Sequence, residues 1–245
     1  MIRRLGGVLF LLLIASALLQ SQFQVAKRRT VSSAAATPTD VSSFEDEAFG
    51  SSTTGDFSLT DGSYLLCGLC WFDQAQTISS FTVGCGGTPT LAHNPTDSTP
   101  ASIRGALAHT AITSTDASCT ITLTLSGGSD WVRFVCREVS GQAASSPVEA
   151  TVVNAQSDPG LGDNDVTSGD VTTSGANRYI GGFACSNSSG SAPWTAGSGY
   201  SDLDSTFEEA VSEWKEQASA GDTPATFKHS AEFGDTIAFA VAVKP

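Results

Sequence analysis

Residues 131–141, which read WVRFVCREVSG, constrain the fold of this chain more than any other stretch. Every second residue from Val132 to Cys136 is apolar, which is the two-residue period of a β-strand with one packed face. The opposite face carries two cations, Arg133 and Arg137, so we expect it to meet solvent or a shallow groove. A strand this apolar is expected in the interior of a sheet, flanked on both sides.

Further stretches carry strand patterns and are separated by turn residues. Residues 119–125, CTITLTL, alternate cleanly, residues 59–72 hold an apolar run typical of a buried strand, and residues 237–243, IAFAVAV, are strongly strand-like. Turn signals recur roughly every 8–15 residues, which is typical of a sandwich or jelly roll. We therefore predict an all-β fold: a single antiparallel β-sandwich, jelly-roll-like, over residues 56–245.

One stretch carries a competing pattern. Residues 203–218, LDSTFEEAVSEWKEQA, place apolar residues on one helical face, and Ser205 with Glu208 fits a capping box. The pattern alone predicts a helix.

The order of these pieces resembles a recurrent β-sandwich module of phage virion or tail-associated proteins and of large secreted bacterial proteins. The resemblance spans residues 56–244 and is carried by YLLCGLCWF, CTITLTLSGG, WVRFVCREVSG, NRYIGGFACS, GSGY, EWKEQASAGDTPATFK and IAFAVAVK. It implies a strand at residues 213–219 and supplies no catalytic residues. We therefore expect a strand there rather than a helix.

The N-terminal stretch has the pattern of an export signal. Arg3 and Arg4 precede apolar residues 5–19, a run shorter than the roughly 20 residues that span a bilayer. Residues 1–26 are predicted to be a cleaved signal peptide or an uncleaved signal-anchor, with a buried hydrophobic hairpin as a third alternative. Residues 27–55, rich in Ser, Thr and Ala and then acidic, are predicted to be a flexible linker.

The charge of the chain restricts its partners. Of 12 Lys and Arg, five lie in the first 29 residues, where there are no acids, and this leaves seven cations against 25 acids, a net charge of −18 for the rest. Such a body repels phosphate backbones, so nucleic acid is not an expected partner, whereas cations or neutral ligands are compatible with it.

The six cysteines of an exported chain predict disulfides, for which six cysteines allow 15 connectivities. Cys85 and Cys119, at the ends of predicted elements, are the first candidates, with the others as candidate core thiols. Cys67 and Cys70 form a C-x-x-C, but residues three apart in a strand face opposite sides, so we interpret them as buried or disulfide-bonded rather than redox-active or zinc-binding.

The sequence contains no recognisable catalytic motif. The histidines His93, His109 and His229 are scattered, and no serine or cysteine has the G-x-S-x-G setting of a nucleophile. Glu138 is a candidate for one carboxylate of a glycosidase pair, which needs a second carboxylate about 5–10 Å away. A structural ion pair or a sheet-surface acid is the interpretation we favour for it.

An acidic, glycine-containing loop at residues 158–170 predicts a possible calcium site. Calcium takes six to eight oxygen ligands on a flexible backbone, and the loop, DPGLGDNDVTSGD, supplies carboxylates without matching EF-hand spacing. A solvated, turn-rich loop is the alternative. The candidate ligands are Asp158, Asp163, Asp165 and Asp170.

Aromatic residues in Gly- and Ser-rich loops suggest a ligand surface. Trp194 and Tyr200 are predicted to form a sugar-stacking platform with Trp131 or Trp71, and the alternative is that they cap the sandwich core. Asn187 opens an N-x-S sequon.

We therefore expect a non-enzymatic, secreted or virion-surface β-sandwich module, a structural decoration or a binder of a surface glycan or protein. No cofactor is expected apart from the possible calcium, and membrane contact is expected only through the N-terminal segment. The alternative is a secreted jelly-roll carbohydrate-active enzyme, and the N-terminal anchor is the alternative to free secretion.

Overall fold

The computed structural model describes residues 37–49, 52–72, 75–93, 102–127, 131–157, 165–187, 194–204, 209–229 and 234–245. Within these ranges the chain forms sixteen β-strands and no helix. The predicted signal segment, residues 1–26, lies outside the described residues. Among the described residues, no helix is long and apolar enough to cross a membrane.

The first eight strands form two antiparallel sheets. They are β1 (Thr39–Phe49), β2 (Ser52–Leu59), β3 (Tyr64–Trp71), β4 (Ile78–Val83), β5 (Thr90–His93), β6 (Arg104–Ala111), β7 (Asp116–Leu125) and β8 (Trp131–Ser140). One sheet has the order β1-β8-β3-β6-β5 and the other the order β2-β7-β4. The predicted interior position of β8 is confirmed, because β1 and β3 flank it.

The last eight strands repeat this arrangement. They are β9 (Val148–Gln156), β10 (Asp165–Thr173), β11 (Arg178–Ser186), β12 (Trp194–Ala196), β13 (Ser201–Asp204), β14 (Ala210–Gln217), β15 (Gly221–His229) and β16 (Thr236–Val243). Their sheets have the orders β9-β16-β11-β14-β13 and β10-β15-β12. Adding eight to each strand number of the first half gives the second half.

The repeat extends to the register of the strands. Tyr64 pairs with Val139, and Tyr179 pairs with Val243. The first strand of each half also carries a bulge at the equivalent place. In β1 the bulge lies between Asp40 and Ser42, opposite β8, and in β9 it lies between Val148 and Ala150, opposite β16. The first strand pairs with the last in both halves, as in a jelly roll. The predicted all-β, antiparallel, jelly-roll-like architecture is therefore confirmed, but the chain forms two such sandwiches where a single one was predicted.

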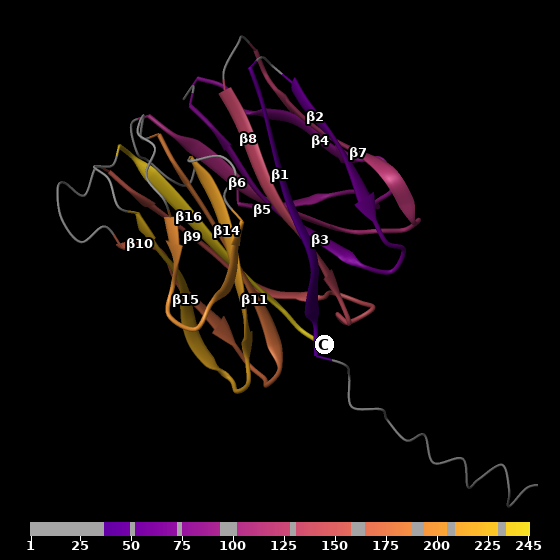
Figure 1. The fold of residues 1–245 in the computed structure, drawn as a ribbon, viewed down its shortest axis with the longest axis vertical. Helices are drawn as coiled ribbons and strands as arrows, with labels where there is room; N and C mark the ends of the chain where they lie inside the picture. Colours follow the sequence, from indigo (N-terminus) through magenta and orange to yellow (C-terminus); the bar gives the residue numbers. More distant parts are fainter. Residues whose placement is uncertain are drawn as a thin grey trace, which may run out of the picture. The chain divides into compact units, whose positions relative to one another are not determined.

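The two sandwiches pack through their five-stranded sheets, so that four sheets stack in layers. Figure 1 shows the indigo-to-pink strands of the first half beside the salmon-to-yellow strands of the second. We call the contact between the five-stranded sheets the seam. Its apolar side chains come from both sheets: Tyr64, Leu66, Cys70, Ile103, Leu107, Val135 and Val139 from one, and Tyr179, Phe183, Cys185, Ala210, Ile237, Phe239, Val241 and Val243 from the other.

The layering explains why some strands are apolar throughout. Every residue of β3 and of β16 is buried, because one face of each lies inside its own sandwich and the other in the seam. β7 lies in an outer three-stranded sheet, and from Cys119 to Leu125 its buried residues alternate with more exposed ones. Continuous apolar runs thus belong to the inner sheets and the alternating run to an outer one.

The prediction that the cationic face of β8 meets solvent is wrong. Arg137 is fully buried in the seam, where it donates to a carboxylate oxygen of Asp40 at 3.0 Å and to the backbone oxygen of Ser212 at 3.1 Å. The hydroxyl of Tyr179 donates to the other oxygen of Asp40 at 2.7 Å. The second sandwich covers this face, and a buried cation is tolerated there because it is paired and hydrogen-bonded.

The flexible linker predicted at residues 27–55 is also corrected. Its described part forms β1 and the start of β2, and β1 pairs along the whole length of β8. Asp40 pairs with Arg137, and the ring of Phe44 stacks on that of Phe57 with centroids 4.0 Å apart. Residues 39–49, which the sequence predicted to be part of a solvated linker, therefore form an edge strand of the first sandwich.

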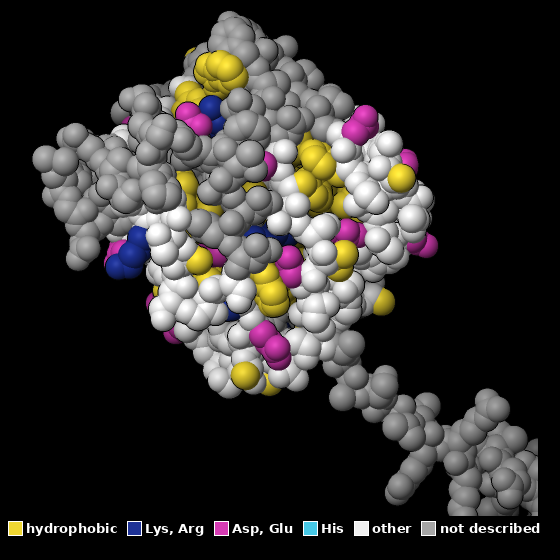
Figure 2. Space-filling model, in the orientation of Figure 1, with side chains coloured by type: hydrophobic (Ala, Val, Ile, Leu, Met, Phe, Trp, Pro, Cys, Tyr) yellow, Lys and Arg dark blue, Asp and Glu magenta, His cyan; other side chains and the backbone are white. Residues whose placement is uncertain are grey.

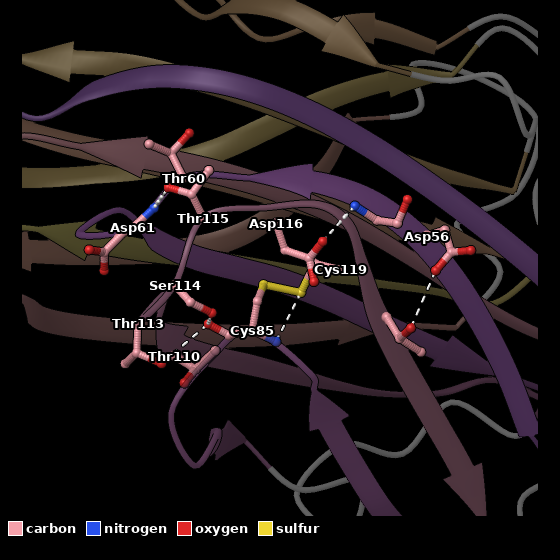
Figure 3. The surroundings of a disulfide bond; sticks show 12 residues. Asp56, Thr60, Asp61, Cys85, Thr110, Thr113, Ser114, Thr115, Asp116 and Cys119 are labelled. Carbon is pink, nitrogen blue, oxygen red and sulfur yellow. Dashed lines mark hydrogen bonds between the residues drawn. A yellow bond between two sulfur atoms is a disulfide. The ribbon is translucent and has the colours of Figure 1, made fainter.

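All six cysteines are bonded, and the predicted pair Cys85–Cys119 is confirmed. Cys67 and Cys70, predicted to be buried or disulfide-bonded, are bonded to Cys136 and Cys185, so the alternative that the remaining cysteines are core thiols is wrong. Cys67 and Cys70 point to opposite faces of β3, as predicted for residues three apart. Figure 3 shows the pair that joins the β4–β5 connection to β7 in the first sandwich. Three disulfides indicate an oxidising, extracellular environment.

The stretch with a helix-compatible pattern is a strand where it is described. Residues 201–204 form β13 and residues 210–217 form β14, and β14 pairs along β11. Pairing with β11 and burial on both sides outweigh the local helical periodicity. The expected strand at residues 213–219 is confirmed as far as residue 217.

Candidate functional site

The two ends of the seam differ. The first described residues, Thr37 and Pro38, lie against Gly141, and the backbone nitrogen of Lys244 donates to Pro147 at 2.9 Å. We call this the proximal end, and Figure 1 marks the C-terminus here. The opposite, distal end holds the start of β8, the start of β16, and the ends of β3 and β11.

Trp131 stands at the distal end of β8 with 44% of its surface exposed. Among the described residues, Val41 and Leu91 are the other large hydrophobic side chains with comparable exposure. Its neighbour in alternation, Val132, is buried inside the first sandwich, so the Trp131 side chain lies on the seam side of the sheet. An indole ring exposed at the edge of the seam is the feature of this surface that most suggests binding.

Arg133 holds this ring in place. Its guanidinium carbon lies 5.6 Å from the ring centroid of Trp131 and 5.3 Å from that of Phe72. A guanidinium nitrogen lies 3.1 Å from a carboxylate oxygen of Glu209, which belongs to the second sandwich. Cation–π contacts contribute about 0.5–1 kcal/mol each at exposed sites and more where they are desolvated. We call Trp131, Arg133, Phe72 and Glu209 the distal platform.

Further polar contacts cross the seam at this end. Ser102 of the first sandwich donates its hydroxyl to a carboxylate oxygen of Asp235 at 2.7 Å, and the amide nitrogen of Asn187 donates to the Ser102 hydroxyl. The side-chain nitrogen of Asn187, the acceptor residue of the sequon, is therefore already hydrogen-bonded within the protein. Near the top of Figure 2, hydrophobic, basic and acidic side chains lie side by side.

The structure does not bring together the three aromatics predicted to bind a ligand. Trp194 is 4% exposed and packs edge-on against Phe227 and His229 in the core of the second sandwich, so its predicted loop exposure is wrong. Tyr200 is half-buried, and its hydroxyl donates to the backbone oxygen of Pro224 at 2.8 Å. Both belong to the second sandwich, whereas Trp131 ends a strand of the first. Trp194 lies in the short strand β12, which was not predicted because the residues around it are rich in Gly and Ser.

The predicted calcium loop is described only in part. Asp158 and Asp163 lie outside the described residues. Asp165 pairs with Lys228 at 3.3 Å on the surface, and Asp170 is exposed on β10. In the described part of the chain, no three His, Cys, Asp or Glu side chains gather as metal ligands would.

Glu138, the candidate carboxylate of the alternative enzyme, is buried and hydrogen-bonded to other parts of the first sandwich. It is 1% exposed and accepts hydrogen bonds from the backbone nitrogen of Thr60 at 2.7 Å, the hydroxyl of Ser63 at 2.6 Å and the hydroxyl of Ser42 at 3.0 Å. A buried carboxylate with three donors joins β1, the β2–β3 turn and β8. It does not face a ligand surface.

Sequence reasoning missed a second buried carboxylate, that of Glu213 on β14. Its oxygens accept from the backbone nitrogens of Gly197 at 2.7 Å and Thr226 at 3.1 Å. Burial raises the pKa of Glu213 to about 7, despite these donors and the nearby Lys215 ammonium. The helix-like pattern around it gave no signal of burial. Glu213 clamps the segment after β12 onto β15 inside the second sandwich.

A cavity of about 280 Å³ lies at the proximal end, between the turn before β3, the end of β6 and residues 142–147. Tyr64 contributes its largest lining side chain, and no lining residue is charged. Tyr64 also hydrogen-bonds His109 at 2.7 Å, and burial lowers the pKa of this histidine. The lining offers an apolar surface without a group for acid–base chemistry.

Comparison of the chain with protein-family models, with curated proteins and with solved structures finds no match.

Proposed function

We propose that the protein is a non-enzymatic, secreted surface module, on a cell or a virion, that is held at its proximal end and presents its distal end to a surface ligand. The observation that carries this proposal is the difference between the two ends of the seam. The chain enters and leaves the described fold at the end where Thr37 and Lys244 lie, and the exposed ring of Trp131 is at the other.

The construction of the fold supports a structural role. Each buried charged side chain considered above is fixed by protein groups: Arg137 by Asp40, Glu138 by hydroxyls and a backbone nitrogen, and Glu213 by two backbone nitrogens. Three disulfides lower the conformational entropy of the unfolded chain, which suits a protein that stays outside the cell. The resemblance of the sequence to virion and secreted bacterial modules points in the same direction.

The test is surface display of the full chain, produced with its own N-terminal segment in a secreting bacterial host. We expect an antibody to detect the protein on intact cells or in the medium. We also expect all six cysteines to resist an alkylating reagent until a reductant is added. Protein that accumulates inside the cell with alkylated cysteines contradicts the proposal. Release of reducing ends from polysaccharides by the purified protein contradicts its non-enzymatic part and favours the carbohydrate-active enzyme.

A further inference from the structure

We propose that the distal platform binds a neutral glycan chain, with the exposed face of Trp131 stacking on a pyranose ring. This inference names the ligand of the proposed surface module and therefore rests on the proposed function. It begins from the cost of exposing Trp131. The ring is 44% exposed, and burial of apolar surface is favourable, so a ligand that covers the exposed face of the indole gains free energy from its burial.

The surroundings of the ring provide preorganisation. Arg133 is almost buried, lies beside both Trp131 and Phe72, and pairs with Glu209 across the seam. Two sandwiches thus fix one guanidinium, and the guanidinium fixes one indole. A ligand that stacks on a ring already held loses less entropy on binding than one that stacks on a mobile side chain.

Charge narrows the class of ligand. The guanidinium of Arg133 lies against the indole and repels an ammonium group that approaches the same ring. The net charge of −18 that follows the first 29 residues repels polyanions such as nucleic acids and sulfated polysaccharides. A neutral ligand remains, and the C–H face of a sugar ring is the neutral surface that stacks on indole.

Polar groups at the same end suit vicinal hydroxyls. The side chain of Glu209, which pairs with Arg133, is 28% exposed, and the carboxylate of Asp235 lies at the distal end of the second sandwich, where it accepts from Ser102. Carboxylates and amides offer the paired donors and acceptors that sugar hydroxyls need, and aromatic faces with polar neighbours are typical of carbohydrate sites.

Comparison of the two sandwiches shows that the platform is a specialised feature of the first. In register, Trp131 corresponds to Asp235, Arg133 to Ile237 and Phe72 to Asn187. A few equivalent positions keep the same residue in both sandwiches, as with Tyr64 and Tyr179, but the platform positions do not. The distal end therefore combines an aromatic and cationic half from one sandwich with a polar half from the other.

The experiment probes the full secreted chain on an array of neutral oligosaccharides, namely glucans, mannans, galactans and N-acetylglucosamine oligomers, together with a proline-rich peptide. Titrations followed by tryptophan fluorescence then give affinities. We expect Trp131→Ala to weaken binding to the best glycan at least tenfold and Trp131→Phe to weaken it several-fold. Leu91→Ala, which removes a similarly exposed side chain from β5, is the matched control and should bind as the wild type does.

The outcomes separate this inference from the proposed function. Absence of binding to every neutral glycan, or binding that Trp131→Ala leaves unchanged, overturns the glycan site. Binding of the proline-rich peptide in its place assigns the ring to a protein partner. Either result leaves surface display intact, because the display assay is scored on the same variants without ligand. An unchanged unfolding midpoint for Trp131→Ala shows that lost binding is not lost folding.

Discussion

Cys70 and Cys185 occupy equivalent positions in the two sandwiches and are bonded to each other. Each lies six residues beyond the tyrosine that marks the start of the register, on β3 and on β11. Beside this bond, a Cβ at Gly68 would lie 2.7 Å from the Cβ of its own counterpart, Phe183. Equivalent residues that meet twice along the same pair of strands show that β3 and β11 run side by side in the same direction.

Removal of this bond is expected to weaken the protein more than removal of a bond within one sandwich. Cys70 and Cys185 close a loop of 115 residues, whereas Cys85 and Cys119 close one of 34. The chain-entropy argument gives about 5 and about 4 kcal/mol for such loops. Guanidinium denaturation of the two double alanine variants should rank them in this order, and the reverse order would argue against a stapling role at the seam.

Disruption of the buried pair Asp40–Arg137 is expected to cause a large loss of unfolding free energy, part of which a second substitution should restore. Asp40→Asn leaves the Arg137 cation in the seam without its counter-charge, which costs about 3–5 kcal/mol of unfolding free energy. Asp56→Asn, at an exposed position, is the control and should change stability by less than about 0.5 kcal/mol. Adding Arg137→Met to Asp40→Asn should recover part of the loss. If the double variant is as unstable as the sum of the single variants, the two residues are not coupled.

Glu213 predicts a stability that declines with pH. Its pKa is about 7 in the fold against about 4.5 in the unfolded chain, so the protonated form favours folding. This stabilisation is present below about pH 4.5, is lost progressively up to pH 7, and amounts to about 3 kcal/mol in all. Unfolding free energies of the wild type and of Glu213→Gln should be compared from pH 5 to 8. Their difference isolates Glu213, because His109 and the other groups titrate in both proteins, and a constant difference would contradict the shift.

Because the two five-stranded sheets approach closely at Gly68, a methyl group added there is expected to destabilise the protein. Gly68→Ala would place a Cβ against Phe183, and since the contact is with the root of that side chain, the sheets must separate. Overpacking of this kind costs about 1–3 kcal/mol. Gly127→Ala, in open space, is the matched control. Thermal unfolding should show a lowered midpoint for the first variant and an unchanged one for the second.

Much of the secondary structure could be predicted from alternation and turns. The strands at residues 119–125 and 131–140 follow from the period of two, and Cys85–Cys119 followed from the position of both residues at element ends. These features are local, and local patterns report whether one face of a strand is buried.

The rest depends on which surfaces meet. The duplication is carried by strand order and by a few matched residues such as Tyr64 and Tyr179, which alone do not stand out in the sequence. Arg137 looked solvent-facing because nothing near it in sequence shows that a second sheet covers it. The distal platform combines Glu209 with Arg133 from the other sandwich, so single-strand patterns could not have found it.

Pairing of the first strand with the last has a consequence for the order of folding. Neither sandwich can close until its last strand is available, so β1 cannot pair fully before residue 140 is present, and β9 cannot before residue 243 is present. Until the second sandwich forms, the seam face of the first, which is apolar and contains Arg137, is exposed to solvent. Contacts of such high sequence separation form slowly. The chain in which only the first sandwich has formed is therefore the stage at which this protein is most prone to aggregate.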